Sequence, residues 1–430
     1  MDYTQRLLRA IPGGAHTYSR GFDQFPENAP SILKRGKGAY AYDAEENEYL
    51  DYGMALRAVH IGYAEEAIDE AAIAQIRNGN NLTRPSMIEL EAAELMIELI
   101  DSVDMVKFTK NGSTAVSAAV KLARAYTGRD FVARCAEHPF FSYDDWFIGS
   151  TPIVRGIPRE TQEQTKSFPY NDLGALEELI TRYPNQFACV VLEAATTEPP
   201  AEGYFRGIRE LCNRHGILLI LDEMITGFRW HMKGAQHLYS VEPDLCTFGK
   251  AMANGYSVAC VGGRREVMEL GSIELEGRER VFLLSTTHGA EMSGLGAFVA
   301  TMKYMEEHQV VDHLWSYGAQ LIDLLNKRAE EFNVSHSFRA GGIPCSPFYL
   351  TLDAHGNNSL ELRTLFSQEM IRGGVLIPWI ALSFRHGEQE LEKTDVALCS
   401  ALRTYADALE NGTRNLLKSA PIQPVFRRFN

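Results

Sequence analysis

Short apolar runs alternate with segments of helical spacing between about residues 88 and 310. Apolar residues recur at helical spacing in 115–126 and 205–215, which predicts amphipathic helices. The runs 187–193 and 217–222 are mainly apolar, as is typical of strands buried on both faces. This alternation predicts an α/β fold with a mostly parallel seven-stranded sheet covered by helices. The predicted strands are 105–109, 131–135, 187–193, 217–222, 245–248, 258–261 and 281–284.

The two ends of the chain carry a different pattern. Residues 39–43 and 48–51 have the composition of short strands around a turn, which predicts a hairpin. After residue 310, the helical stretch 313–332 precedes a strand at 348–352. Neither end is large enough to hold a strong core alone, so we expect the ends to pack together. The expected divisions are an N-terminal segment of 1–55, a large domain of 56–310 and a small α+β domain of 311–430.

Composition excludes several classes of function. The chain has 430 residues, 45% of them hydrophobic and 23% charged, which fits a globular enzyme. A net charge of −14 argues against nucleic-acid or anionic-membrane partners. No apolar stretch approaches the roughly 20 residues that span a bilayer. The seven cysteines are dispersed without a Cys-x-x-Cys pair, which indicates free thiols and a cytoplasmic location.

The pair Asp222 and Lys250 is the most informative feature of the chain. Lys250 lies between glycine-containing turns, and a lysine in such a place forms a Schiff base with an aldehyde cofactor. Asp222 ends an apolar run, and a carboxylate there holds a pyridinium nitrogen protonated. A lone lysine is usually a solvated surface charge. The two residues together point to pyridoxal phosphate (PLP) and to no metal.

Two turns have the composition of anion sites. Residues 110–115 and 285–291 each combine hydroxyl groups with glycine between an apolar run and a helix. Backbone N–H groups at a helix N-terminus favour a phosphate. The alternative for either turn is an ordinary Ser/Thr helix cap.

A second acid accompanies Asp222. Glu193 ends the apolar run 187–193, which is the predicted strand before the one that ends in Asp222. Ligands of α/β sheets bind outside the carboxyl ends of the strands, so both acids would face a ligand there. The alternative is that both acids are ordinary turn residues, and the occurrence of an acid at the end of two such strands weakens this alternative.

The order of these features resembles that of the class III (subgroup II) PLP-dependent aminotransferases, in particular the glutamate-1-semialdehyde 2,1-aminomutase group. The resemblance runs from Ile11 to about Asp395 and implies the fold type I architecture of PLP-dependent transferases. It also implies small-molecule substrates and a homodimer. The blocks that carry it are Arg209–Cys212, Gly216–Arg229, Pro243–Leu245, Gly249–Lys250 and Gly262–Glu266.

The resemblance assigns roles to individual residues. Lys250 matches the Schiff-base lysine that also moves the substrate proton, and Asp222 matches the acid that pairs with the pyridine nitrogen. Thr287 matches a threonine that reaches the phosphate from the neighbouring subunit. The residues that match the phosphate-binding loop are Asn111, Gly112 and Ser113.

Further matches concern the cofactor ring and the substrate. Met224 occupies a position that packs on one face of the ring, and Phe140 aligns with the aromatic residue on the other face. The segment around Phe140 departs from the family pattern, so His138 or Phe141 remains an alternative. Arg20 matches an arginine that grips the substrate carboxylate, against the alternative of a surface arginine.

The substrate half of the pattern departs from the aminomutases. The aminomutases have Ser-Trp-Gly-Pro where this chain has residues 55–58, and a glycine-rich loop where it has 149–168. They also have a glutamate that is absent from residues 378–386 of this chain. A mutase must retain its intermediate during two half-reactions, whereas a transaminase need not. We therefore expect an aminotransferase acting between an amino donor and an aldehyde or ketone. The alternatives are the aminomutase, a PLP racemase, and a cofactor-binding protein without turnover.

Overall fold

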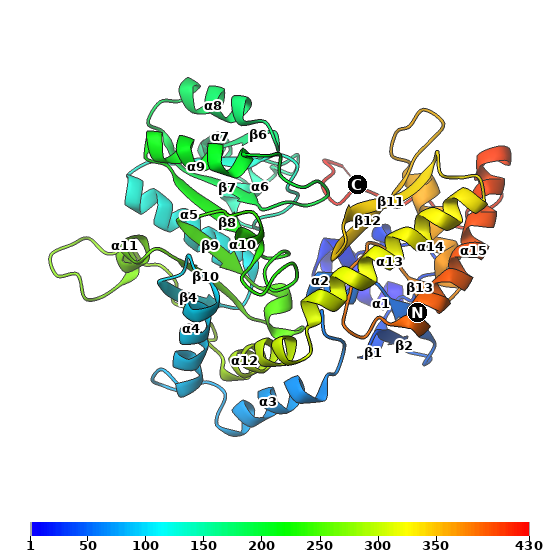
Figure 1. Cartoon of the computed structure of the whole chain (residues 1–430), viewed down its shortest axis with the longest axis horizontal. Coiled ribbons are helices and arrows are strands. Elements are labelled where there is room, and N and C mark those ends of the chain that lie inside the picture. Colours follow the sequence, from blue (N-terminus) through cyan, green and yellow to red (C-terminus); the bar gives the residue numbers. More distant parts are fainter. Residues whose placement is uncertain (1, 430) are drawn as a thin grey trace. The chain divides into compact units, whose positions relative to one another are not determined.

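The computed structural model describes residues 2–429, and its chain divides into two compact units (Figure 1). The large unit contains Glu66–Val311, and the small unit combines the residues up to Glu65 with Asp312–Arg427. The sequence placed these divisions after residues 55 and 310.

A seven-stranded sheet forms the core of the large unit, in the order β4-β10-β9-β8-β7-β5-β6. Strand β10 runs antiparallel to both of its neighbours, and the other strands share one direction. The predicted mostly parallel seven-stranded sheet is therefore confirmed. The strands are β4 (Met105–Thr109), β5 (Phe131–Cys135), β6 (Thr165–Phe168), β7 (Phe187–Glu193), β8 (Leu218–Asp222), β9 (Leu245–Phe248) and β10 (Ala259–Gly263).

One predicted strand of the sheet was wrong. Residues 281–284 have no regular secondary structure, and the side chain of Phe282 is 69% exposed. The seventh strand is instead β6, which pairs in parallel with β5 at the edge of the sheet. Only Thr165 and Phe168 of β6 are buried, so its sequence lacks the apolar run of a central strand.

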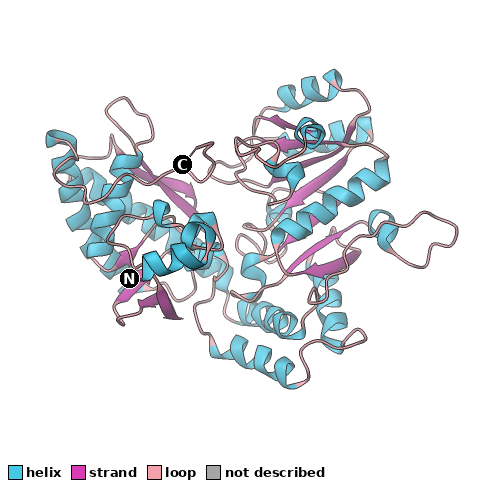
Figure 2. Cartoon of the chain, turned by 180° about the vertical axis from the view of Figure 1, so that it is seen from behind, coloured by secondary structure: helices cyan, strands magenta, loops and turns pink. Residues whose placement is uncertain are grey.

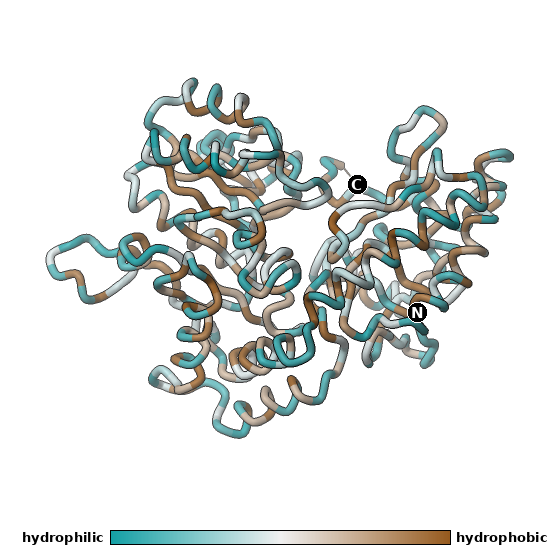
Figure 3. Tube along the Cα trace, viewed as in Figure 1, coloured by the Kyte–Doolittle hydropathy of each residue, from teal (hydrophilic) through white to brown (hydrophobic). Residues whose placement is uncertain are grey.

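Helices surround this sheet, and every residue of β7 and β8 is buried (Figure 2). Helix α5 packs against β7, β9 and β10 through a face rich in alanine and valine. The hydropathy trace shows the same contrast between apolar strands and polar loops (Figure 3). The helices are α3 (Glu66–Arg77), α4 (Met87–Leu99), α5 (Gly112–Thr127), α6 (Asp145–Ile148), α7 (Arg159–Gln164), α8 (Leu173–Arg182), α9 (Tyr204–His215), α10 (Ala235–Leu238), α11 (Arg265–Met268) and α12 (Met292–Glu307).

The small unit joins the two ends of the chain. Its four-stranded sheet has the order β1-β2-β3-β13, in which the C-terminal strand β13 pairs in parallel with β3. The predicted hairpin is present as β2 and β3. The strands are β1 (Leu33–Lys37), β2 (Tyr40–Asp43), β3 (Glu48–Asp51), β11 (Phe338–Ile343), β12 (Ser346–Thr351) and β13 (Val375–Leu376).

None of the helices between residues 2 and 429 combines the length and apolar character needed to cross a bilayer.

The helices of the small unit include three single turns near the N-terminus. The longer helices are α1 (Tyr3–Ala10), α13 (Val310–Glu331), which starts at the boundary, α14 (Leu360–Arg372) and α15 (Glu388–Asn411), with the four-residue α2 at Met54–Arg57. The single turns are η1 (Pro12–Gly14), η2 (Tyr18–Arg20) and η3 (Phe22–Gln24).

Candidate active site

The carboxyl ends of three neighbouring strands bring the acidic residues and the lysine together. Glu193 ends β7 and lies directly opposite Asp222, the last residue of β8. Asp222 in turn lies opposite Thr247 of β9, and that strand ends just before Lys250. The parallel register therefore places these groups at one edge of the sheet, where α/β folds bind ligands.

Asp222 is a buried carboxylate, 2% exposed. Its Oδ1 accepts a hydrogen bond from the Met224 backbone N–H at 2.9 Å and from the Thr247 hydroxyl at 3.2 Å. Burial raises the pKa of Asp222 to about 6, although the Met224 N–H and the charge of Lys250 oppose this shift. A cation held against Asp222 would stabilise its ionised form.

Lys250 occupies a strained backbone position. It is half-buried and opens the short helix η4 (Lys250–Ala253) with a φ of +46°. Residues other than glycine pay on the order of 1–3 kcal/mol for such a conformation, and strain of this kind clusters at functional sites. A side chain at the preceding Gly249 would require Met224 to move, because an added Cβ would lie 2.6 Å from the Met224 sulfur.

The turn before α5 has the features of an anion cradle. Helix α5 is 16 residues long, and the Asn111 side chain caps it by accepting from the Thr114 N–H at 2.9 Å. The helix is thus capped, but by Asn111 and not by the Ser or Thr of the stated alternative. The first-turn N–H groups of Gly112 and Ser113 have no intrahelical acceptor. These N–H groups and the helix dipole favour a phosphate.

Gly112 keeps this cradle open. A Cβ on Gly112 would lie 2.7 Å from the Met224 sulfur. Met224 itself is 6% exposed and packs with Ala115 and Ala259. Met224 therefore lies between the turn before α5 and Gly249. The sequence predicted that Met224 packs against a cofactor ring.

We expect Gly112→Ala to weaken PLP binding at least tenfold, because the added methyl group must displace the Met224 side chain, which packs beside the cradle and is proposed to contact the cofactor ring. Titration of the cofactor-free protein with PLP, followed by fluorescence, measures this change. Gly174→Ala in α8 is the control, since its Cβ meets only the Asp172 side chain at 3.5 Å. Equal affinities of Gly112→Ala and wild type would rule out this cradle.

The aromatic segment places its members in different environments. Phe140 is 48% exposed, and Phe141 is 2% exposed. Both rings contact Phe147 edge-on, with centroid distances of 5.7 Å. Phe141 is thus a core residue, whereas Phe140 remains accessible to a ligand. The Tyr143 backbone N–H donates a hydrogen bond of 3.1 Å to the Ser113 side-chain hydroxyl, which joins this segment to α5.

His138 is a buried group whose position the sequence did not reveal. Its Nδ1 accepts from the Glu193 backbone N–H at 2.9 Å, and desolvation lowers the pKa of His138 to about 4. The ring is therefore neutral near pH 7 and carries its proton on Nε2. Among residues 2–429, the buried Nε2 has no hydrogen-bond partner. A donor left unsatisfied inside the protein is costly, so a bound ligand that accepts from it would be stabilised.

Thr287 is exposed and lies in a turn before α12. The N-cap of α12 is Glu291, so Thr287 does not cap that helix. Glu291 forms an ion pair of 2.7 Å with Lys110, which links this turn to the turn before α5 within one chain. The sequence placed Lys110 and Glu291 in the two glycine-containing turns 110–115 and 285–291, but it did not show that these turns meet, because the two residues lie far apart in the chain.

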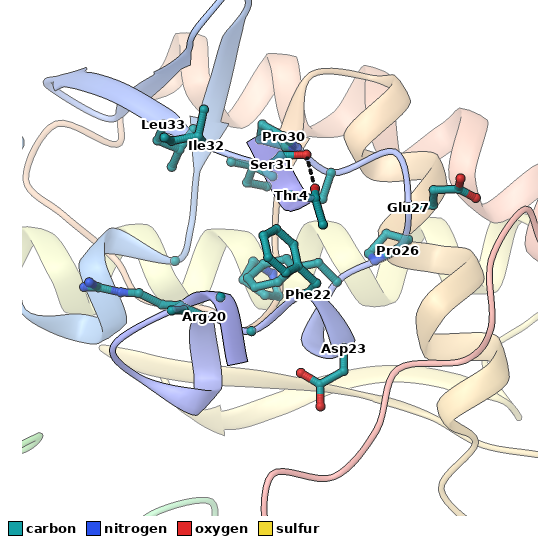
Figure 4. Close-up of a pocket in the computed structure, with 18 of the residues that line it drawn as sticks. Thr4, Arg20, Phe22, Asp23, Pro26, Glu27, Pro30, Ser31, Ile32 and Leu33 are labelled. Carbon is teal, nitrogen blue, oxygen red and sulfur yellow. Dashed lines mark hydrogen bonds between the residues drawn. The ribbon is translucent and has the colours of Figure 1, made fainter. Parts of the chain in front are cut away.

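Arg20 lies in the small unit, at the end of η2, where its side chain lines a cavity (Figure 4). The other candidate residues all lie in the large unit. They fit PLP in three respects: a buried acid for the ring nitrogen, a helix N-terminus for the phosphate, and a constrained lysine. The candidate site has two parts, the pair Asp222 and Lys250 and the cradle before α5. Met224 lies next to both Gly112 of the cradle and Gly249, the neighbour of Lys250.

Comparisons with known proteins identify the family of the chain. The family model described as aminotransferase class-III matches residues 23–351. The chain is 31% identical to a 3-aminobutyryl-CoA aminotransferase of Cloacimonas acidaminovorans, with 94% of this chain and 96% of that protein covered. It is 28% identical to a glutamate-1-semialdehyde 2,1-aminomutase of Francisella philomiragia, covering 94% and 97%.

A solved structure supports the same fold assignment. The PLP internal aldimine form of FumI from Sphingopyxis sp. MTA144 superposes with a TM-score of 0.87 at 25% identity. The match covers 95% of this chain and 97% of that chain. An omega-transaminase from Sphaerobacter thermophilus gives a TM-score of 0.83 at 26% identity, covering 94% and 97%.

Proposed function

This chain belongs to the class III aminotransferases, which use PLP, and we propose that it transfers an amino group to an aldehyde or ketone through Lys250. When bound, PLP accepts the electrons released at the substrate carbon. The observation that carries the proposed site is the buried carboxylate of Asp222, whose ionised form burial disfavours beside Lys250.

Each site residue has a distinct proposed task. The Lys250 Nζ takes and returns the proton of the substrate carbon, and its strained backbone limits the positions of its side chain. Asp222, supported by the Thr247 hydroxyl, holds a proton at the ring nitrogen of the cofactor. The first turn of α5, including Asn111 and Ser113, binds the phosphate.

The remaining large-unit candidates position the cofactor ring. We propose that Met224 packs on one face and Phe140 on the other. Glu193 lies beside Asp222 at the same edge of the sheet and is proposed to contact the cofactor. His138 Nε2 offers a neutral hydrogen-bond donor next to Glu193.

An intermolecular transaminase remains the preferred function over the aminomutase. Relatives of both kinds match the whole length of the chain, so overall likeness does not separate them. The departures at 55–58, 149–168 and 378–386 all concern the substrate half. A panel of amino donors and acceptors, analysed by product mass, tests the proposal. Isomerisation of an amino aldehyde without any added acceptor would instead favour the aminomutase.

We also propose a homodimer, in which Thr287 completes the phosphate site of the partner subunit. Thr287 is exposed in the single chain, which leaves it available to a second copy. Sedimentation analysis of wild type and Thr287→Ala at increasing PLP concentration tests this arrangement. A cytoplasmic location is part of the same proposal, because all seven cysteines are free thiols.

We expect Arg20→Ala to raise KM for a carboxylate substrate about 5- to 150-fold, as loss of a charged hydrogen bond costs roughly 1–3 kcal/mol. The kcat value should change less, since Arg20 acts in binding. Steady-state kinetics with a saturating second substrate measure both constants. Arg9→Ala is the control, because Arg9 is an exposed arginine of α1 outside the cavity. An unchanged KM would remove Arg20 from the substrate site.

A further inference from the structure

The segment that joins β5 to α6 carries the aromatic candidates of the large unit. It covers residues 136–144 and contains neither a helix nor a strand. Phe140 is exposed, whereas the side chains of His138 and Phe141 are buried. The question is therefore what holds Phe140 in place in a segment without regular secondary structure.

His138 fastens the first half of this segment to β7. Its Nδ1 accepts a hydrogen bond from the Glu193 backbone N–H at 2.9 Å. Glu193 is the last residue of β7 and lies opposite Asp222 in the parallel register. This first anchor therefore lies at the edge of the sheet that carries the acid proposed for the ring nitrogen.

The chemistry of His138 fits an anchor better than a packing role. Desolvation lowers the pKa of His138 to about 4, so the ring is neutral near pH 7 and its Nδ1 keeps a lone pair for the Glu193 N–H. The proton on Nε2 has no acceptor among residues 2–429. An apolar side chain would avoid this unsatisfied donor, but it would leave the Glu193 N–H without its acceptor. Packing alone thus does not account for a histidine at this place.

Hydrogen bonds to α5 fasten the second half of the segment. The Tyr143 N–H donates to the Ser113 hydroxyl at 3.1 Å, and the Ser142 hydroxyl lies 3.0 Å from that of Ser117. The indole N–H of Trp146, in the following helix, donates to Ser117 Oγ at 2.8 Å. Ser113 belongs to the first turn of α5. This second anchor therefore lies at the cradle proposed for the phosphate.

Pro139, Phe140 and Phe141 form the short span between the two anchors. The proline ring restricts φ to about −65°, and the Phe141 ring packs edge-on against Phe147 in the core. The Phe140 backbone consequently has little freedom, while one side of its ring contacts Phe147 edge-on. A span held at both ends is preorganised, because less conformational entropy is lost when a ligand binds against it.

Met224 connects the same two parts of the site by another route. Its backbone N–H donates to Asp222 Oδ1 at 2.9 Å, and its sulfur would lie 2.7 Å from a Cβ on Gly112. Met224 thus touches both the acid at the sheet edge and the cradle before α5. The span with Phe140 is anchored to the same edge and to the same helix turn. The two residues proposed to cover the cofactor ring therefore depend on common supports.

We propose that His138 is a positioning residue, which places Phe140 against the cofactor ring by anchoring its segment to the Glu193 N–H. The inference rests on the proposed cofactor site and adds the residue that sets the geometry of its aromatic face. Asparagine can replace the acceptor, because its Oδ1 is as many bonds from the backbone as the histidine Nδ1. Leucine has no acceptor, so His138→Asn and His138→Leu separate the hydrogen bond from the volume of the ring.

Hydrogen exchange in the cofactor-free protein tests the anchor without catalysis. We expect His138→Leu to speed exchange of the amides of residues 140–144 about tenfold, because release of one anchor makes local opening easier. His138→Asn should stay within about twofold of wild type. If the leucine variant does not fold, His138→Gln replaces it, since its amide group lies one methylene further from the backbone. Equal exchange in wild type and in the variant without the acceptor would overturn the proposal.

His231→Leu is the matched control for this measurement. The Nδ1 of His231 accepts from the Lys233 backbone N–H at 3.0 Å, which is a hydrogen bond of the same kind in the same unit. Its loss should leave exchange at residues 140–144 unchanged. Faster exchange there in His231→Leu would show a general loosening of the unit and would count against a specific anchor.

A double substitution shows whether His138 acts through Phe140. We expect Phe140→Ala and His138→Leu each to weaken PLP binding about 2- to 10-fold, the range that aromatic stacking contributes. Fluorescence titration measures the affinity, and visible circular dichroism reports the surroundings of the bound cofactor. The double variant should bind PLP as Phe140→Ala does, because the anchor then has no ring to position. Multiplied effects, or a Phe140→Ala affinity equal to that of wild type, would overturn the proposal.

Kinetics separate this role of His138 from the proposed function. We expect His138→Leu to lower kcat more than it changes KM, and His138→Asn to restore kcat. PLP binding that depends on His138 and Phe140 as expected, without amino transfer to any acceptor, would refute the proposed function alone. Amino transfer and PLP binding that His138→Leu leaves unchanged would refute the positioning role alone.

Discussion

Lys250→Ala is expected to abolish amino transfer, lowering kcat/KM by at least roughly 10⁴-fold. The substitution removes both the proposed covalent attachment to PLP and the group that moves the substrate proton, and proton transfer alone contributes about 10²–10⁴-fold. Borohydride reduction of the PLP-loaded protein, followed by peptide mass analysis, should find the cofactor on the peptide with residue 250 in wild type. The variant should carry no cofactor mass.

Lys233→Ala provides the matched control for this experiment. Lys233 lies in the same unit and forms an ion pair of 3.1 Å with Asp101, with 41% of its side chain exposed. Its loss should change neither the reduced adduct nor kcat/KM by more than about twofold, because exposed ion pairs contribute little. Wild-type turnover by Lys250→Ala would remove this lysine from the mechanism.

Asp222→Asn is expected to lower kcat about 10²–10³-fold while leaving PLP bound. The amide has nearly the same shape as the carboxylate, but it lacks the negative charge that keeps the ring nitrogen protonated, and loss of such a preorganised group costs this much. The visible spectrum of the bound cofactor reports its protonation and should change as well. Asp101→Asn is the control, since that carboxylate is 68% exposed. A kcat of Asp222→Asn within twofold of wild type would contradict the assignment.

Although Asp222→Asn should lower kcat, we expect it to stabilise the fold of the cofactor-free protein. Burial raises the pKa of Asp222 from 3.8 to about 6, so between these values the folded state binds more protons than the unfolded state. Its contribution to stability therefore falls as pH rises from about 4 to 6, by on the order of 3 kcal/mol. Urea unfolding of the cofactor-free proteins should show Asp222→Asn gaining stability relative to wild type over this range. Parallel pH profiles would contradict the proposed cause.

The agreement between sequence and structure is best at the centre of the sheet. Strands β7 and β8 are buried on both faces, so their apolar runs predict strands without knowledge of their neighbours. Asp222 ends β8 and Lys250 follows β9 closely. Their positions at strand ends can therefore be read from the local order of residues in the chain. The sequence did not predict the edge strand β6, and it wrongly predicted a strand at 281–284. Pairing at the edge of a sheet depends on partners far along the chain, which the local pattern does not show.

The amino-acid sequence by itself determined the α/β class and the family and supplied the candidate cofactor residues, because these depend on local periodicity and on short motifs. Tertiary structure alone decided the partners of Asp222, the neutral state of His138 and the ion pair between Lys110 and Glu291. It also decided the cavity beside Arg20, whose wall joins the two ends of the chain. Burial and contacts between distant residues set these features, and neither is encoded in the spacing of residues along the chain.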